Sequence, residues 1–156
     1  MLRSQTKPFA CPIASSEIEP NDDMATGQVI GNLLCASRPA EVVGCTTELD
    51  GDDGEDWFQF DVPSACTSVG VDVRLTFPLA FETLGLELRD ASGATIATGG
   101  ACPQADPDDG DDQACIEHRL TPGGHYALLV ARTGEGACEG SCAHNRYTLT
   151  LQLETP

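Results

Sequence analysis

Two short acidic segments carry the side chains best suited to chemistry. Each holds several oxygen donors at a spacing that neither a helix face nor a strand face requires. Six of them are the candidate ligands of one metal ion: Glu17, Glu19, Asn21, Asp22, Asp53 and Asp56. Calcium takes about six to eight oxygen ligands, with carboxylates and carbonyls mixed. We therefore expect the two segments to form the two halves of one calcium site.

The spacing within each segment supports this expectation. Glu17, Glu19 and Asn21 alternate, so an extended chain would project all three to one side. Asp22 follows at once and can be brought in by a turn after Pro20. The 50–56 segment has the composition of an EF-hand loop but not its pattern, because the sixth position is glutamate rather than glycine. The alternative is two polar turns, with Asp22 capping one turn of helix within residues 23–29.

The charge of the chain excludes some partners. The 156 residues contain 25 acidic and 8 basic side chains, for a formal charge of −17. This balance argues against nucleic acid and anionic lipid, which need a basic face. Fifteen of the acids fall in residues 17–23, 48–56 and 106–112. We interpret 106–112 as a solvated loop, and a second cation site there is the alternative.

The eight cysteines indicate an oxidising compartment. Their number is even and no Cys-x-x-Cys occurs, which favours disulfides over a zinc site. Proximity in the sequence suggests three pairs, and elimination suggests a fourth. The expected pairs are Cys35–Cys45, Cys102–Cys115, Cys138–Cys142 and Cys11–Cys66.

The N-terminal residues show no signal peptide, because 1–10 lack an apolar stretch. We expect a piece of a longer exported precursor, secreted or at the cell surface, with residues 1–16 as a linker. Lipidation of Cys11 is an alternative, although Pro8-Phe9-Ala10 fits a lipid-anchor signal poorly. No later segment is long and apolar enough to span a membrane. We expect a monomer.

Residues 17–154 have the pattern of one all-β domain. Apolar and polar residues alternate with period 2 in several short segments, for example from Val69 to Phe77 and from Tyr147 to Leu153. Turn sequences such as 121–124 separate them. The predicted fold is an antiparallel, jelly-roll-like β-sandwich of about eight strands, stapled by disulfides. The expected inter-sheet core comprises Phe58, Phe60, Val71, Val73, Leu75, Leu86, Leu88, Leu128, Val130, Leu149 and Leu151.

Five motifs in order resemble the bacterial pre-peptidase C-terminal domain. They are Glu-Ile-Glu-Pro-Asn-Asp at 17–22, Asp-Trp-Phe-Gln-Phe at 56–60, Leu-Glu-Leu-Arg-Asp-Ala-Ser-Gly at 86–93, the segment 122–130, and Tyr-Thr-Leu-Thr-Leu at 147–151. The resemblance implies a β-sandwich accessory domain of secreted peptidases and other exported proteins. Some members bind calcium, and those of bacterial collagenases bind collagen. The same six oxygen donors are the ligands that the resemblance implies.

The sequence therefore predicts a calcium-stabilised, non-catalytic accessory or binding module, with an extracellular protein or polysaccharide as a further partner. A ligand-free structural or secretion-assisting domain is the first alternative, and an unrecognised hydrolase is the second. Neither Gly-x-Ser-x-Gly nor His-Glu-x-x-His occurs. We interpret His118, His125 and His144 as surface residues, with His118 in a strand and His144 in a loop. Most aromatic residues fall on the apolar side of strands, with Trp57 as the exception.

Overall fold

The computed structural model describes residues 17–18, 20–36, 38–47, 55–78, 83–103, 111–134 and 144–155. Within these ranges the chain forms nine strands and no helix. The strands are β1 (Gln28–Val29), β2 (Ala40–Thr47), β3 (Glu55–Asp61), β4 (Val69–Pro78), β5 (Thr83–Asp90), β6 (Thr95–Thr98), β7 (Asp111–Leu120), β8 (His125–Gly134) and β9 (His144–Glu154). The all-β prediction is confirmed.

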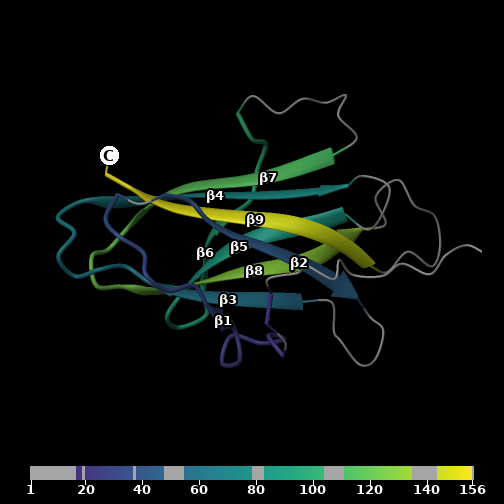
Figure 1. The fold of residues 1–156 in the computed structure, drawn as a ribbon, viewed down its shortest axis with the longest axis horizontal. Coiled ribbons are helices and arrows are strands. Elements are labelled where there is room, and N and C mark those ends of the chain that lie inside the picture. The colour runs from purple at the N-terminus through teal and green to yellow at the C-terminus, as the bar shows by residue number, and fades with distance from the viewer. Residues whose placement is uncertain are drawn as a thin grey trace, which may run out of the picture.

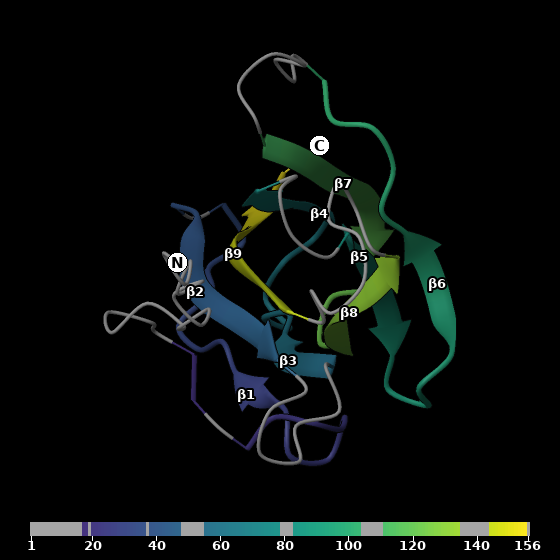
Figure 2. The same cartoon turned by 90° about the vertical axis from the view of Figure 1, so that its right-hand side faces the viewer.

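The strands form two sheets that face each other. One sheet has five strands in the order β1-β3-β8-β5-β6, and the other has four in the order β2-β9-β4-β7. Figure 1 shows the sheets as two layers, and Figure 2 shows them from the end of the sandwich. Every pairing is antiparallel except the short parallel one between β1 and β3. This is the predicted sandwich.

The core lies between the two sheets and contains the residues that alternation predicted. All eleven expected core side chains are at most 2 % exposed. The burial pattern of β4 alternates strictly from Val69 onward, with inward residues buried and outward ones partly or largely exposed. Its neighbour β9 contributes Leu149, Leu151 and Leu153 to the same core. Period 2 therefore identified the buried face of each strand correctly.

A tight turn carries the chain from β7 in one sheet to β8 in the other. The amide of Gly124 donates to the carbonyl of Thr121 at 3.0 Å. Pro122 supplies the fixed φ of the second position, and Gly123 has a φ of +77°. A positive φ at the third position is what a type II turn requires, and glycine adopts it without strain. The Pro-Gly-Gly signal in the sequence therefore has a direct structural cause.

The segment before the sandwich differs from expectation. No helical turn forms within 23–29. Instead, Asp23 Oδ1 accepts hydrogen bonds from the amide and hydroxyl of Thr26, at 2.8 and 3.0 Å, and the chain then enters β1. These bonds lower the pKa of Asp23, chiefly through the Thr26 amide. The alternative in which Asp22 caps a helical turn is therefore not seen.

One disulfide prediction is confirmed and two are wrong. Cys102 pairs with Cys115, whose main chain forms a β-bridge with Gly100. Cys35, however, pairs with Cys66. This excludes both the Cys35–Cys45 and the Cys11–Cys66 pairings, and Cys45 is disulfide-bonded elsewhere. The predicted Cys138–Cys142 pair lies outside the described residues.

The path of the chain explains why Cys35 and Cys66 were assigned the wrong partners. Because β1 runs parallel to β3, the residues after both strands arrive at the same end of the sandwich. Cys35 and Cys66 follow β1 and β3 respectively and therefore meet there. The chain then returns along β2 toward the opposite end, where Cys45 is buried. Proximity in the sequence was a poor guide to the partner of Cys35, because β2 carries Cys45 to the opposite end of the sandwich.

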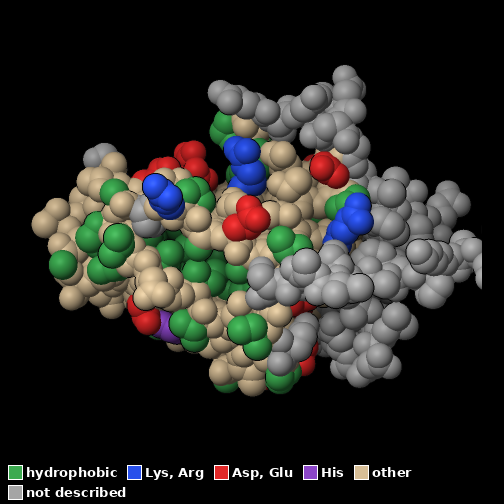
Figure 3. Space-filling view, viewed as in Figure 1, with side chains coloured by type: hydrophobic (Ala, Val, Ile, Leu, Met, Phe, Trp, Pro, Cys, Tyr) green, Lys and Arg blue, Asp and Glu red, His purple; other side chains and the backbone are tan. Residues whose placement is uncertain are grey.

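Charged side chains are interspersed on the face seen in Figure 3, where acidic and basic groups alternate with apolar and neutral ones. Asp111 and Asp112, placed by expectation in an acidic loop, begin β7 instead, and 104–110 lies outside the described residues. In the part of the chain that the structure covers, no helix is long and apolar enough to cross a membrane.

Candidate functional site

A buried acid–tyrosine contact lies where the two sheets meet at the start of β3. Asp56 is the second residue of β3 and points inward, so its side chain is fully buried. The hydroxyl of Tyr147, on β9 of the opposite sheet, donates to Asp56 Oδ2 at 2.6 Å. Tyr147 itself is 2 % exposed. One of the predicted ligands is therefore held inside the sandwich.

Glu17 reaches the same tyrosine hydroxyl from the N-terminal segment. Its Oε2 lies 3.1 Å from the Tyr147 hydroxyl, and its Oε1 accepts a hydrogen bond from the amide of Cys45 at 2.9 Å. The amide of Glu17 donates to the carbonyl of Val43 at 3.2 Å. These contacts fix Glu17 against β2 and place its carboxylate beside that of Asp56.

Asn21 is fully buried and anchors the segment at a second point. Its main-chain carbonyl accepts a hydrogen bond from the main-chain amide of Trp57 at 2.8 Å, next to Asp56. The carboxylates of Glu17 and Asp56 therefore meet at one end of the sandwich, and the main chain of Asn21 lies next to Asp56. The predicted joining of the two acidic segments is seen in these residues, although the ion itself is not tested by them.

The electrostatics of this cluster concentrate negative charge around one hydroxyl. Burial raises the pKa of Tyr147 well above its usual value, and the charges of Asp56 and Glu17 raise it further. The tyrosine therefore stays protonated and donates. A hydroxyl carries a single hydrogen, yet two carboxyl oxygens lie within hydrogen-bond distance of it. A nearby positive charge would relieve the repulsion between the two acids.

The other three candidate ligands are Asp22, Glu19 and Asp53. Asp22 is partly exposed and is not brought into the Tyr147 cluster by any hydrogen bond or ion pair within the described residues. Glu19 and Asp53 lie outside those residues. Across the same ranges, no group of three or more His, Cys, Asp or Glu side chains is placed to hold a metal. The donors that do meet are all oxygen atoms, which suits calcium better than zinc.

Two residues of the cluster were not singled out by the sequence. Tyr147 has the apolar phase of β9, which predicts a core residue and gives no sign that its hydroxyl meets two acids. Gly44, on β2, pairs with Tyr147 across the sheet. A Cβ at position 44 would collide with the ring and hydroxyl of Tyr147 and approach Glu17 Oε2 to 2.8 Å. A glycine inside a strand was the available signal for this close approach.

The three histidines lie in strands β7, β8 and β9. His118 lies in β7 as predicted. His125 begins β8, where its Nδ1 lies 2.7 Å from Asp61 Oδ1 and its Nε2 lies 3.1 Å from Gln59 Oε1. His144 is the first residue of β9 rather than part of a loop, which corrects that prediction.

Solved structures share this fold. The pre-peptidase C-terminal domain of a collagenase from Bacillus anthracis covers 81 % of this chain and 93 % of its own, with a TM-score of 0.50 and 18 % identity. The chain has the fold of that domain. The predicted resemblance is therefore confirmed at the level of the fold, which is all that this identity shows.

Two other structures match less well. A periplasmic inhibitor of g-type lysozyme from Aeromonas hydrophila has a TM-score of 0.48 and 15 % identity, covering 81 % of this chain and 95 % of its own. A carbohydrate-binding module of a lichenase from Cellvibrio mixtus has a TM-score of 0.35 and 15 % identity, covering 76 % and 91 %. No family model and no curated protein matches the sequence.

Proposed function

We propose that this chain is a calcium-stabilised, non-catalytic accessory or binding module of an exported protein. The observation that carries the proposal is the meeting of Glu17 and Asp56 at the Tyr147 hydroxyl, with the main chain of Asn21 hydrogen-bonded next to Asp56. Calcium bound there would neutralise two adjacent acids and tie the N-terminal segment to both sheets. The disulfides of the described residues support export, because such bonds persist in oxidising compartments.

The structure of the cluster favours a stabilising role over catalysis. Each described polar group supports the architecture: Glu17 holds the β2 backbone, Asn21 holds the β3 backbone, and Tyr147 connects the sheets. A catalytic acid or base needs access to a substrate proton, whereas Asp56 is fully buried. The solved domain with the same fold is named as the pre-peptidase C-terminal domain of a collagenase, which is the accessory context that we propose here.

Thermal unfolding with and without calcium tests the proposal. At free calcium about a hundredfold above the dissociation constant, linkage predicts about 2.7 kcal/mol of added stability. Asp56→Asn should remove most of this increment, because it deletes a charged ligand. The matched control is Asp72→Asn in β4, which pairs with Glu117 and Gln152 within the four-stranded sheet, away from Asp56 on β3 of the other sheet. This control should keep the full increment.

The increment, rather than the absolute stability, is the quantity to compare, because Asp56→Asn also alters a buried hydrogen bond. Magnesium at the same concentration should have a much smaller effect, since it prefers a smaller, strictly octahedral site. Equal melting temperatures for wild-type protein in calcium and in chelator would overturn the calcium proposal. The ligand-free structural domain would then be the better description.

A further inference from the structure

The outer face of the five-stranded sheet carries a surface that the calcium site does not use. Trp57 points outward from β3, opposite in phase to the buried Phe58 and Phe60. In register beside it lie Leu129 on β8 and then Glu87 on β5. Trp57 is the only tryptophan of the chain. A large aromatic side chain on a solvent-facing strand position suggests contact with a ligand.

A hollow of about 350 Å³ opens next to this row. Its lining includes Gly85, Leu129 and Ala131, which are small or apolar. A Cβ at position 85 would lie 2.5 Å from the Cγ2 of Thr133, so a larger residue there would crowd the hollow. Its size falls in the range of sites that take small molecules or short polymer segments.

The walls of the hollow balance positive and negative charge. Glu55 and Glu87 supply two carboxylates, and Arg89 and Arg132 supply two guanidinium groups. Although the chain as a whole is strongly acidic, this hollow contains two of its eight basic residues. A strongly charged ligand of either sign would meet two like charges. A neutral polar ligand would meet donors and acceptors in equal measure.

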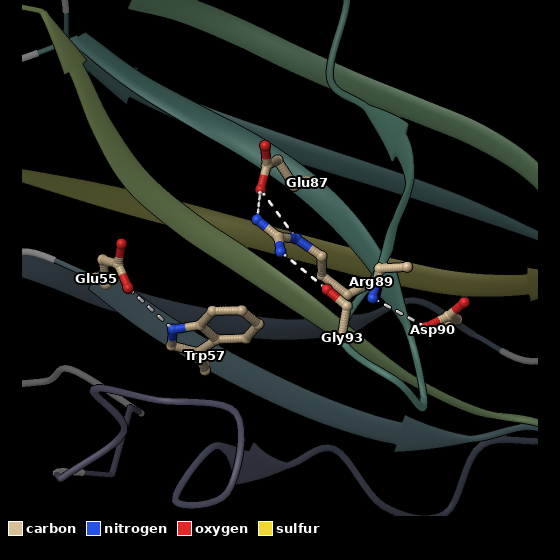
Figure 4. A network of polar contacts seen from close by, with 7 residues as sticks. Glu55, Trp57, Glu87, Arg89, Asp90 and Gly93 are labelled. Carbon is tan, nitrogen blue, oxygen red and sulfur yellow. Dashed lines mark hydrogen bonds and ion pairs between the residues drawn. The ribbon is translucent and has the colours of Figure 1, made fainter.

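Trp57 is held in a fixed orientation at the edge of this hollow. Figure 4 shows its indole between Glu55 and the side chain of Arg89. The indole Nε1 donates to Glu55 Oε2 at 3.3 Å, and the Arg89 guanidinium carbon lies 5.5 Å from the ring centre. Arg89 is in turn fixed, by an ion pair with Glu87 and by a 2.9 Å hydrogen bond to the carbonyl of Gly93. An aromatic group that is held in advance loses little entropy when it binds.

We infer that this surface binds a neutral polysaccharide chain, with Trp57 stacking on a sugar ring and the hollow receiving its neighbour. A sugar ring offers an apolar C–H face to the indole. Its neighbouring hydroxyls each donate and accept hydrogen bonds, which matches the mixture of carboxylates, guanidinium groups and the hydroxyls of Thr98 and Thr133. The inference deepens the proposed binding role but does not depend on calcium.

A polypeptide partner fits this surface less well. Peptide recognition on a sheet relies on exposed apolar anchors or on unpaired edge strands. The exposed large hydrophobic side chains among the described residues are Ile18, Val29 and Leu34, none of which lines the hollow. Three of the strands that line the hollow, β3, β8 and β5, are paired on both sides, and the edge strand β6 contributes only Thr98 to its lining.

Because Trp57 is the only tryptophan, its fluorescence reports on this surface directly. Wild-type protein should be titrated with hexasaccharides of β-1,4-glucose, β-1,4-N-acetylglucosamine and α-1,4-glucose, and separately with gelatin and heparin. We expect a saturable emission change with at least one neutral hexasaccharide and none with heparin. Arg89→Ala should weaken that binding at least tenfold. Glu117→Gln, on the outer face of the other sheet, should leave it unchanged.

Calorimetry with the same sugar extends the test to Trp57→Ala, which should lose measurable binding, and to Trp57→Phe, which keeps an aromatic face and should retain part of it. Thermal melting identifies any variant that fails to fold. If the Trp57 variants fail to fold, the affinity of Arg89→Ala for the sugar decides whether this surface binds it. No response to any of the three hexasaccharides, a response to gelatin or heparin alone, or equal affinity in Trp57→Ala would overturn the inference. Titrations in calcium and in chelator separate this result from the calcium proposal, whose test is the melting increment.

Discussion

The hydroxyl of Tyr147 on β9 donates to Asp56 on β3 at 2.6 Å, so a buried polar contact connects the two sheets. Hydrogen bonds to a charged acceptor are shorter and stronger than neutral ones. Most of the remaining interface is apolar, although Thr46 and Asn145 are also buried, and apolar contacts alone allow many alternative packings. This one directional contact therefore helps to fix how the sheets sit on each other at the end where the N-terminal segment arrives.

Tyr147→Phe should destabilise the protein by about 1.5–3 kcal/mol, because it removes the donor to a buried carboxylate and leaves the ring in place. Chemical unfolding in the presence of a chelator measures the loss. The control is Tyr126→Phe, whose hydroxyl accepts a hydrogen bond from the Thr121 amide at 2.9 Å. That neutral contact should be worth only about 0.5–1.5 kcal/mol. Similar losses in both variants would contradict a special role for Tyr147.

Stability should fall at alkaline pH because of the same tyrosine. Burial raises the pKa of Tyr147 in the folded protein. Above about pH 10 the unfolded chain loses this proton while the folded chain keeps it, so each further pH unit costs up to about 1.4 kcal/mol. The stability advantage of wild-type over Tyr147→Phe should therefore shrink as pH rises from about 9 to about 11. Parallel pH profiles for the two proteins would show that the tyrosine does not titrate differently on folding.

Gly44→Ala should cost about 1–3 kcal/mol, because the new methyl group displaces the Tyr147 ring that crosses this position. The same variant should reduce the calcium-dependent increment in melting temperature, since the ring positions Glu17 and Asp56. Gly31→Ala is the matched control, because a Cβ there meets no atom within 4 Å. Thermal melting of both variants checks this. An unchanged melting temperature for Gly44→Ala would mean that β2 adjusts to the added methyl group without loss of stability.

Removing the Cys35–Cys66 disulfide with paired serines should cost more than removing Cys102–Cys115. The two bonds close 31 and 13 residues respectively, and the chain-entropy model then gives a difference of about 0.8 kcal/mol within losses of about 3–4 kcal/mol. Mass spectrometry of unreduced peptides should find Cys35 joined to Cys66. A peptide that joins Cys35 to Cys45 would show that the assignment is wrong.

Leu149→Ala should destabilise the sandwich by about 2–5 kcal/mol, because the side chain is 1 % exposed and lies in the central strand β9. Leu34→Ala provides the comparison, because that side chain is 65 % exposed and should change stability by less than about 0.5 kcal/mol. Urea unfolding measures both. A small effect at position 149 would place it outside the cooperative core.

Features that depend on nearby residues could be predicted from the sequence. Val71, Val73 and Leu75 alternate with polar neighbours, and a strand with one buried face has no other periodicity. The turn at Gly123 needs only the local φ of proline and glycine. Cys102 and Cys115 lie in adjacent segments, so their pairing followed from proximity.

Features that depend on the path of the chain through the fold could not be predicted from the sequence. Pairing Cys35 with Cys66 requires β1 to run parallel to β3, which no local pattern indicates. The role of Tyr147 depends on β9 lying between β2 and β4, because only this position brings its hydroxyl to Asp56. Glu17 and Asp56 were named as candidate ligands from their type and spacing, whereas the tyrosine that contacts both of them looked like any other core residue.

The central place of the last strand in its sheet affects how the chain folds as it is made. In the order β2-β9-β4-β7, β2 hydrogen-bonds only to β9, and β4 needs β9 on one side. Until residues 144–154 emerge from the ribosome or the export channel, both partners keep open edges and exposed apolar faces. The contact between Glu17 and Tyr147 is among the last to be possible, since it spans most of the sequence. Premature termination within β9 would therefore leave an aggregation-prone chain, whose degradation by cellular proteases would depend on how long β2 and β4 stay unpaired.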